Sequence, residues 1–438
     1  MTSFSAAPNF ASASLRPVAT AGIAALVAVL MAAPLAFGAV QSWAWAGMSI
    51  AIVLLALAWA VGRARAASLT LMWSPLLIPL IAALGLALVQ LLAGLSMDEA
   101  ATRESAMKLV VYALEFFLVL QYFSRASARL WRRVALAVSI YAFALALFAI
   151  LQFFASPGLL YGVIRPRWGG YIFGPYVSHN NYAGLMEMLI PLGIGLALTL
   201  RPRHPGRPLA LFAVLIPVVS VLLCGSRGGV IGLLAEFAFL AVVVFRAQPA
   251  SLERNRALIG GFAVAFLAGA SFFWLDPGGV WQRWEQLSES RELTANLRRQ
   301  LSADTLRMAR AHLAYGVGLG AFAVAYPAYQ TVGTDDVIDY AHNDYAQLLA
   351  EGGAAAAILT VISMVLFFRL AFRRVRGRLQ EPTGWLQLGA AIGVCGILVH
   401  SLLDFNLHIP ANAAWFAFCA ALATARPHSV LESDRSLP

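Results

Sequence analysis

One stretch organises this chain: Ala341-His342-Asn343-Asp344-Tyr345-Ala346-Gln347-Leu348-Leu349-Ala350-Glu351-Gly352-Gly353, where a polar segment at about 276–340 runs into a new apolar helix. Asp344 is a helix-capping residue type and Gln347 follows three residues later, which predicts a capping box. His342 then lies just outside a helix N-terminus, where the helix dipole favours a neutral imidazole and attracts anions. A neutral histidine beside an anion site indicates proton transfer to or from a charged substrate. The alternative is a hydrated loop histidine without a chemical role.

Composition is typical of a polytopic membrane protein. The 438 residues are 61% hydrophobic and only 12% charged, with a mean hydropathy of +0.76, whereas soluble domains average about 25% charged residues. The net charge of +10 requires no nucleic-acid partner, because membrane proteins hold arginine in their cytoplasmic loops. The cysteines all lie in apolar segments without metal-ligand spacing, so we expect small core residues at Cys224, Cys395 and Cys419.

Hydropathy predicts an all-α transmembrane domain of about twelve helices. The apolar runs lie at about 18–38, 43–62, 71–94, 106–123, 132–154, 181–200, 209–225, 228–246, 257–275, 345–368, 385–405 and 409–425. The first run follows Arg16 but is too long for a signal-peptide core, so we expect it to be retained. The predicted organisation is a disordered cytoplasmic tail at 1–17, a single transmembrane domain at 18–425 and a cytoplasmic tail at 426–438.

Arginine distribution predicts the orientation. About 20 of the 31 basic residues fall in one set of loops, which the positive-inside rule assigns to the cytoplasm together with both termini. The outer side then carries two longer segments, at about 155–180 and 276–344, and two short turns, Gly225–Arg227 and Phe405–Ile409. We expect 276–344 to form a large helical loop between the ninth and tenth spans.

Arg227 lies in a short outer turn, Cys224-Gly225-Ser226-Arg227-Gly228-Gly229, between two apolar helices. An ionisable residue at this depth is costly and indicates function. The flanking glycines allow close approach of a ligand or a neighbouring helix. An arginine that merely snorkels to the interface is the alternative.

The large outer loop is basic and amphipathic. Trp281 and Trp284 are typical of interfacial anchors. From about Glu292 to His312 the pattern is helical, with apolar Leu297, Leu301 and Leu306 and basic Arg298, Arg299, Arg307 and Arg310. Such arginines can clamp a phosphate by bidentate hydrogen bonds, and a solvated helix face is the alternative. Gly316-Val317-Gly318-Leu319-Gly320 follows no strand, so we interpret it as a flexible turn and not as a dinucleotide site.

Two further histidine clusters lie on the outer side. Ser178-His179-Asn180-Asn181-Tyr182-Ala183 echoes the stretch around His342 and is a candidate to line the same cavity, although one short echo does not establish a repeat. His400 and Asp404 lie four residues apart, near Asn406 and His408. They suit either a metal site or, in our preferred interpretation, a hydrogen-bonded pair that fixes helix packing.

In order along the chain, the Ser226-Arg227-Gly228-Gly229 turn, the arginine before Gly316-Val317-Gly318 and the His342-Asn343-x-Tyr345-x-x-Leu348-x-x-Glu351-x-Gly353 helix start resemble the O-antigen ligase/polymerase superfamily. The resemblance covers about 170–425 and includes the span layout. It implies essential arginines at Arg227 and Arg298 and an essential histidine at His342. Arg299, next to Arg298, is the other candidate for the arginine of the loop. Two positions depart from the family pattern, where Ser302 and Leu313 replace an aromatic residue and a proline.

The resemblance implies a GT-C-like, metal-independent, inverting glycosyltransferase that needs no cofactor. Its donor would be a glycan on undecaprenyl diphosphate at the periplasmic face of a bacterial inner membrane. Its acceptor would be a lipid-linked repeat unit in a Wzy-type polymerase for O-antigen or exopolysaccharide, which we prefer, or lipid A–core in an O-antigen ligase of lipopolysaccharide biosynthesis. A chain-length regulator is a partner that the polymerase interpretation allows. His342 would be the catalytic base, Arg227, Arg298 and Arg299 would bind the diphosphate, and supporting roles fall to Asn343, Asp344, Tyr345, Glu351, His179, Arg307 and Arg310.

The residues support this chemistry independently. A diphosphate leaving group at the membrane interface needs cations, which two arginines can supply. An acceptor hydroxyl needs a base within hydrogen-bond reach, for which His342 is placed. The competing class is a transporter or flippase of lipid-linked glycan, which would be expected to show repeat symmetry. The concentration of outer polar residues in one asymmetric loop favours an enzyme.

Overall fold

The computed structural model describes residues 10–65, 70–166, 171–201, 203–247, 260–261, 295–331, 333, 337–376, 378–379 and 381–427. Within these ranges the chain is helical and carries no β-strand. It contains two isolated β-bridges, Leu160 with Ile164 and Phe173 with Tyr176, in the segment before the sixth helix.

The first helices form α1 (Phe10–Leu35), η1 (Phe37–Ala39), α2 (Ser42–Ala64), α3 (Leu77–Leu92), α4 (Glu99–Phe123), α5 (Ala128–Ala155), α6 (His179–Thr199), α7 (Gly206–Leu223) and α8 (Arg227–Ala247). The later helices form α11 (Ala295–Ala311), α12 (Phe322–Ala325), η2 (Tyr326–Ala328), α13 (Asp344–Val375), α14 (Pro382–His400), η3 (Asn406–His408) and α15 (Pro410–Thr424). Each predicted apolar run meets one of these helices, apart from 257–275, which lies almost entirely outside the described residues. α1 begins at Phe10 and not at residue 18.

The helices are long and apolar enough for a polytopic membrane protein. Among the described residues, seven helices could cross a membrane by length and composition: α2, α4, α5, α6, α7, α13 and α14. Two shorter apolar helices, Ala19–Leu35 and Leu77–Leu92, accompany them. The all-helical polytopic fold is therefore confirmed, whereas the full number of spans stays a prediction.

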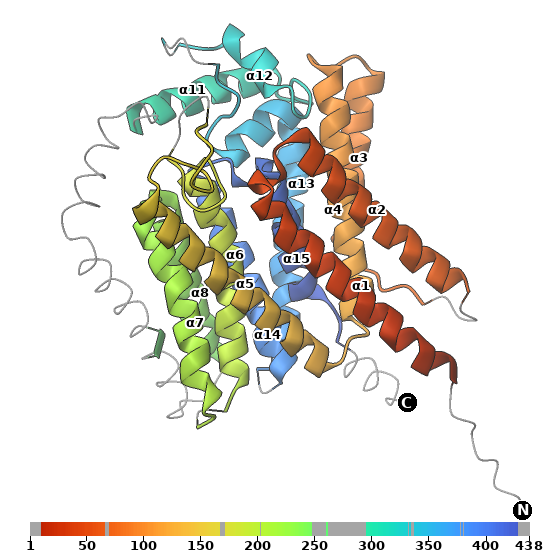
Figure 1. Ribbon diagram of the computed structural model, residues 1–438. Coiled ribbons are helices and arrows are strands. Elements are labelled where there is room, and N and C mark those ends of the chain that lie inside the picture. Colours follow the sequence, from red (N-terminus) through yellow and green to blue (C-terminus); the bar gives the residue numbers. More distant parts are fainter. Residues whose placement is uncertain are drawn as a thin grey trace, which may run out of the picture.

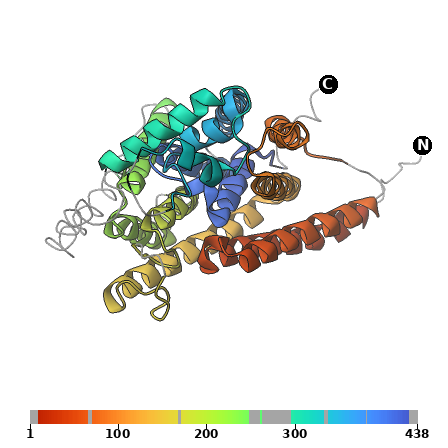
Figure 2. The ribbon, with the colours of Figure 1, turned by 90° about the horizontal axis from the view of Figure 1, so that it is seen from above.

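The helices alternate in direction, and α11 and α12 lie across one end of the bundle (Figures 1 and 2). α6, α8 and α13 all begin at this end, so three helix N-termini meet beneath α11 (Figure 1). We call this end the α11 end. The arginine-rich connections, such as the α4–α5 turn and the α13–α14 turn, lie at the opposite end (Figure 1).

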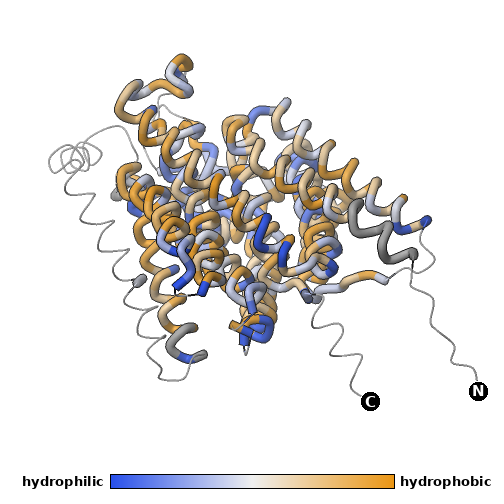
Figure 3. Tube along the Cα trace, turned by 60° about the horizontal axis from the view of Figure 1, so that its bottom comes forward, coloured by the Kyte–Doolittle hydropathy of each residue, from blue (hydrophilic) through white to orange (hydrophobic). Residues whose placement is uncertain are grey.

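Burial divides the helices into a core and a rim. Most of α6 and α14 is buried, whereas most of α2 and α13 is not. The tube is mainly hydrophobic along the helices (Figure 3). Large apolar side chains are exposed on the rim, among them Leu54 and Leu57 on α2 and Ile358 and Val361 on α13. A lipid environment explains this pattern, because acyl chains solvate such side chains and water does not.

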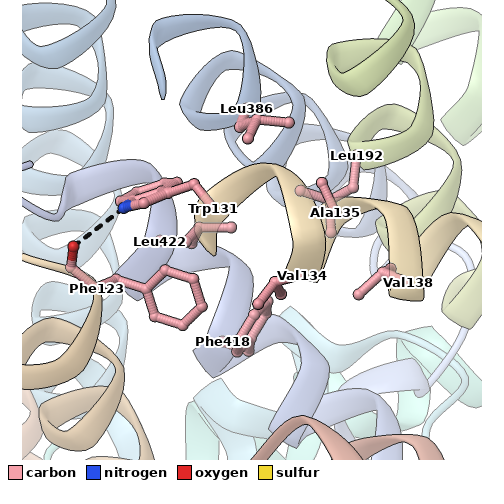
Figure 4. Close-up of a pocket in the computed structure, with 9 residues that line it drawn as sticks. All are labelled: Phe123, Trp131, Val134, Ala135, Val138, Leu192, Leu386, Phe418 and Leu422. Atoms are coloured by element: carbon pink, nitrogen blue, oxygen red, sulfur yellow. Dashed lines mark hydrogen bonds between the residues drawn. The ribbon is translucent and has the colours of Figure 1, made fainter. Parts of the chain in front are cut away.

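The apolar core is closed by well-packed aromatic residues. Trp131 of α5 is fully buried and its indole N–H donates to the carbonyl oxygen of Phe123 at 3.1 Å. Figure 4 shows these residues around a small apolar space with Phe418, Leu386 and other side chains from α5, α6, α14 and α15. The space has no polar side chain along its lining, so we interpret it as core packing and not as a ligand site.

The glycine-rich turn after α11 is held firmly, which corrects the prediction of a flexible turn. The backbone N–H groups of Val317 and Gly318 donate to the carbonyl oxygens of Ala350 and Glu351, both at 3.0 Å. The side chain of Glu351 accepts from the N–H of Gly320 at 2.9 Å. Gln90 of α3 adds a bond to Leu319 N–H at 3.0 Å. The turn therefore fastens the loop to α3 and α13.

Candidate active site

His342 lies at the start of α13, directly opposite a buried carboxylate. Its Nδ1 is 3.2 Å from Oδ1 of Asp404, in the turn after α14. His342 adopts a left-handed backbone conformation with φ of 49°, which costs a non-glycine residue about 1–2 kcal/mol. A strained residue held by surrounding structure is a common feature of functional sites. The side chain of His342 is 20% exposed, whereas that of Asp404 is 2% exposed.

The charge state of Asp404 fixes the role of each imidazole nitrogen. Burial raises the pKa of this carboxyl, but the hydrogen bond and charge of His342, together with the charges of Arg298 and His400, hold its pKa well below the usual range. An ionised carboxylate only accepts hydrogen bonds, so Nδ1 of His342 carries the hydrogen. When the imidazole is neutral, Nε2 is then left as a hydrogen-bond acceptor.

The helix start is capped differently from the sequence prediction. Asn343 is the N-cap of α13, and its side-chain oxygen accepts from the N–H groups of Tyr345 and Ala346 at 3.1 and 3.0 Å. The prediction that Asp344 is the cap was wrong. Gln347 does reach back, but to the N–H of Ala341 at 2.9 Å, beyond the cap. These bonds hold the backbone on both sides of His342.

A chain of hydrogen bonds connects Asp404 to the turn before α8. Asn180, near the start of α6, donates from Nδ2 to Oδ2 of Asp404 at 2.5 Å. Its Oδ1 accepts from the hydroxyl of Ser226 at 2.7 Å. Ser226 also accepts from the N–H of Gly229 at 3.0 Å, which caps α8. The three helix starts are therefore joined, and the segment around His179 belongs to the same cluster.

The two arginines expected to bind a diphosphate lie at this cluster. Arg227 is the first residue of α8, next to Ser226, and is exposed. Arg298 on α11 is half-buried, with one guanidinium nitrogen 3.5 Å from the carbonyl oxygen of Leu403. Its charge acts on Asp404. Arg299 is exposed, so the environment of Arg298 matches the expected position better.

Arg307 and Arg310 lie elsewhere on α11. Nine residues separate Arg298 from Arg307, which on an α-helix places them on opposite faces. Arg307 pairs with Asp304 and lies close to the carbonyl oxygen of Tyr329, and Arg310 is exposed. Leu306 is also exposed, so the predicted apolar face of α11 was wrong at that residue, whereas Leu301 is buried as expected. Trp281 and Trp284 lie outside the described residues.

The remaining candidates hold the site in place. Asp344 accepts from His408 Nδ1 at 2.7 Å, and the hydroxyl of Tyr345 donates to the carbonyl oxygen of Leu398 at 2.7 Å. Glu351 binds the glycine-rich turn, as described above. His179 is buried and its ring packs edge-on against Tyr171 with centroids 4.7 Å apart.

His400 and Asp404 do not form a shared site. His400 ends α14 and pairs with Glu187 of α6 at 2.8 Å, whereas Asp404 lies beyond the helix and faces His342. His408 faces Asp344. Among the residues that the structure describes, no group of three or more His, Cys, Asp or Glu side chains is arranged to hold a metal ion. The preferred interpretation of His400 as a packing pair is thus consistent with the structure, but its partner is Glu187, which sequence reasoning missed.

Aromatic rings enclose one side of His342. Phe405 meets the imidazole edge-on with centroids 4.8 Å apart, and Tyr340 stacks on Phe405 at 4.3 Å. Both side chains are partly exposed. The arrangement places the imidazole of His342 beside a buried carboxylate and an apolar wall, with Arg298 and Arg227 at the same end of a hydrophobic bundle.

Residues 211–361 match the family model described as O-antigen ligase. The resemblance to the O-antigen ligase/polymerase superfamily is confirmed. This match covers the Arg227 turn, α11 and the His342 stretch, and leaves Asp404 outside it. No curated protein matches the chain. Members of this superfamily are glycosyltransferase-like enzymes that act in membranes on lipid-linked glycans. The apolar helices of this chain agree with a membrane location.

Sequence reasoning missed the contact of His342 with Asp404 and the bond of Asn180 to Asp404. Asp404 was noted only beside His400, and Asn180 only as part of an echo. The sequence did contain a signal for this contact, because Asp404 was predicted to lie near a short turn on the same side as His342. A carboxylate that is buried there needs a cationic or hydrogen-bonding partner.

Proposed function

We propose that this protein is an inner-membrane glycosyltransferase that moves a glycan from undecaprenyl diphosphate to a sugar hydroxyl. The observation that carries the proposal is the contact between His342 and buried Asp404 at the meeting point of α6, α8 and α13. Arg298 and Arg227 at the same end supply the cations that a departing diphosphate needs. The family match supports the lipid-linked donor.

The proposed reaction uses these groups as follows. Nε2 of His342 takes the proton of the acceptor hydroxyl, whose oxygen forms a bond to the anomeric carbon of the donor sugar. The bond from that carbon to the phosphate oxygen breaks, and undecaprenyl diphosphate leaves with the bonding electrons. Attack from the opposite face inverts the anomeric centre. Asp404 keeps Nδ1 protonated and stabilises the imidazolium that forms.

We propose a repeat-unit polymerase as the first activity, with a lipid-linked repeat unit as the acceptor. The alternative is an O-antigen ligase with lipid A–core as the acceptor, which the description of the matched family favours. Both reactions need the same base and cations, so the distinction lies in the acceptor. A transporter or flippase remains the competing class, and it would need no catalytic base.

The membrane arrangement belongs to the same proposal. We propose about twelve spans in a GT-C-like fold, with residues 257–275 as the span before the large loop. The α11 end faces the periplasm and both termini face the cytoplasm. The opposite end carries the arginine-rich turns, which supports this orientation.

The test is a transfer assay with purified protein in nanodiscs, a lipid-linked donor and each acceptor in turn. His342→Ala is expected to lower turnover by about 100- to 1,000-fold, the usual scale for a general base. Donor binding should persist, because the arginines remain. Full turnover by His342→Ala would remove the base from the mechanism. An added chelator tests metal independence, since loss of activity would instead require a metal site.

A further inference from the structure

The outward face of α11 carries a groove that the proposed reaction does not use. The groove has a volume of about 370 Å³ and is lined by Gln300, Ala303, Asp304, Leu306, Arg307, Arg310 and Thr331. Arg307 and Arg310 lie about 13 and 18 Å along the helix axis from Arg298, at 1.5 Å per residue, and Arg307 lies on the opposite face. These side chains therefore cannot contact a diphosphate held at Arg298 and His342.

The wall of the groove is built around a buried carboxylate. Asp304 is 1% exposed and accepts from the N–H and hydroxyl of Thr331, both at 2.8 Å, and from the hydroxyl of Tyr326 at 3.1 Å. Arg307 completes the cluster and also lies 3.3 Å from the hydroxyl of Thr331. Three groups, the hydroxyl of Tyr326 and the N–H and hydroxyl of Thr331, thus hold their segment against Asp304, so the groove is preformed. Arg307 of the same helix offsets the charge of Asp304.

The open part of the groove has the chemistry of a carbohydrate site. Gln300 and Arg310 are exposed and offer planar polar groups that can form paired hydrogen bonds with neighbouring sugar hydroxyls. Leu306 is 41% exposed and offers an apolar surface for the C–H face of a sugar ring. Arg310 also adds a positive charge that no carboxylate of the groove offsets, because Asp304 is occupied. The surface therefore favours a glycan, including one with acidic sugars.

The geometry points to a second glycan-binding site in this groove, which holds sugars several units away from the reacting bond. The inference rests on the proposed function, which brings a glycan on a lipid diphosphate to the end of the bundle where α11 lies. A preformed site there would hold a growing or incoming chain while its end reacts at His342. The occupant is a glycan segment of either the donor or the acceptor.

The test uses direct binding and does not need turnover. The probe is the mixture of oligosaccharides released by mild acid from the producing cell's own surface polysaccharide, titrated into His342→Ala protein in nanodiscs by calorimetry. Adding Gln300→Ala and Arg310→Ala together should weaken binding about tenfold, the scale of one charged hydrogen bond. Arg103→Ala is the matched control, since Arg103 is an exposed arginine of α4 with a 2.7 Å ion pair to Glu99, outside the groove, and should bind like the parent.

The outcomes separate the groove from the reaction. Equal binding by the double variant and the control, or no binding by the parent, would contradict a glycan site in the groove. This result does not depend on whether the protein transfers glycan. In a transfer assay the double variant should raise KM about tenfold for one long-chain substrate and leave kcat unchanged. A raised KM for long donors assigns the groove to the donor chain, and a raised KM for the acceptor assigns it to the acceptor chain. Loss of kcat for single-unit substrates would contradict a distal site.

Discussion

At the scale of single residues, the pairing of His342 with Asp404 is the contact on which the proposed chemistry depends. Asp404 is buried, its two oxygens contact His342 and Asn180, and the neighbouring positive charges hold its pKa well below the usual range. A carboxylate at Nδ1 favours the neutral tautomer of His342 that leaves Nε2 as the acceptor. In the proposed reaction Asp404 would position the base and stabilise its charged form.

We expect Asp404→Asn to lower turnover about 10- to 100-fold, less than the loss of the base itself, because His342 stays present but is held in the wrong tautomer. The amide can donate to Nδ1 and so favour the wrong tautomer. The measurement is kcat in the transfer assay, with KM for the donor largely retained. Asp344→Asn is the comparison, because that carboxylate faces His408 and not His342. A larger loss in Asp344→Asn would contradict the assignment of Asp404.

We expect Arg298→Ala to abolish measurable transfer while Arg299→Ala keeps most of it. The half-buried guanidinium of Arg298 lies beside Leu403 and acts on Asp404, whereas Arg299 is exposed. Arg298→Lys should rescue poorly, because lysine lacks the planar fork that matches a phosphate. Donor binding and transfer are measured for all three variants. The opposite ranking of the two alanine variants would place the diphosphate at Arg299.

At the scale of elements, the site depends on how the large loop is fastened to α13. Gly353 breaks the regular helix with φ of 62° and ψ of −161°. A Cβ at this position would lie 2.6 Å from the backbone of Ala314, in the segment after α11. The glycine therefore allows the loop to approach the helix closely, and that approach sets the position of α11 over His342.

Gly353→Ala should destabilise the protein by more than about 2 kcal/mol, since this backbone region, essentially restricted to glycine, alone costs about 1–3 kcal/mol and the added Cβ would clash with backbone atoms. Thermal unfolding in nanodiscs, followed by tryptophan fluorescence, measures the change. Gly85→Ala is the matched control, because a Cβ there would meet nothing within 4 Å. Similar melting temperatures for the two variants would show that the loop does not need this approach.

At the scale of the whole molecule, polarity along the bundle axis joins the topology to the proposed function. The site cluster and α11 occupy one end, and the arginine-rich turns occupy the other (Figure 1). Lipid-facing apolar side chains cover the helices between the two ends. An enzyme whose lipid-linked substrate is presented at one face of the membrane needs its active site at one end of the bundle.

We expect the α11 end to be periplasmic. Alkaline phosphatase inserted at Gly333, which is exposed and has open space around it, should be active, whereas the same reporter inserted in the turn between α13 and α14 should be inactive. The reason is the arginine content of the second turn. A cytoplasmic reporter, green fluorescent protein, at the same two positions serves as the control. The reverse pattern would overturn the orientation and the proposed donor with it.

The sequence by itself determined the membrane class, the positions of the described apolar helices and the placement of Arg227, Arg298 and His342 at one end of the bundle. These follow from hydropathy, helix length and charge distribution, which are local properties of the chain. The sequence also contained a signal that was not used. The nine-residue offset between Arg298 and Arg307 places them on opposite faces of a helix, so the two cannot bind the same phosphate group.

Only the tertiary structure decided which groups meet. Asp404 lies 62 residues after His342, and Asn180 lies 224 residues before Asp404. Such contacts depend on how α6, α13 and the turn after α14 pack and rotate against each other, which no local periodicity encodes. The cap of α13 shows the same limit at short range, because Asn343 and Asp344 both suit a cap. The ion pair of Asp344 with His408, made through tertiary packing, leaves the cap to Asn343.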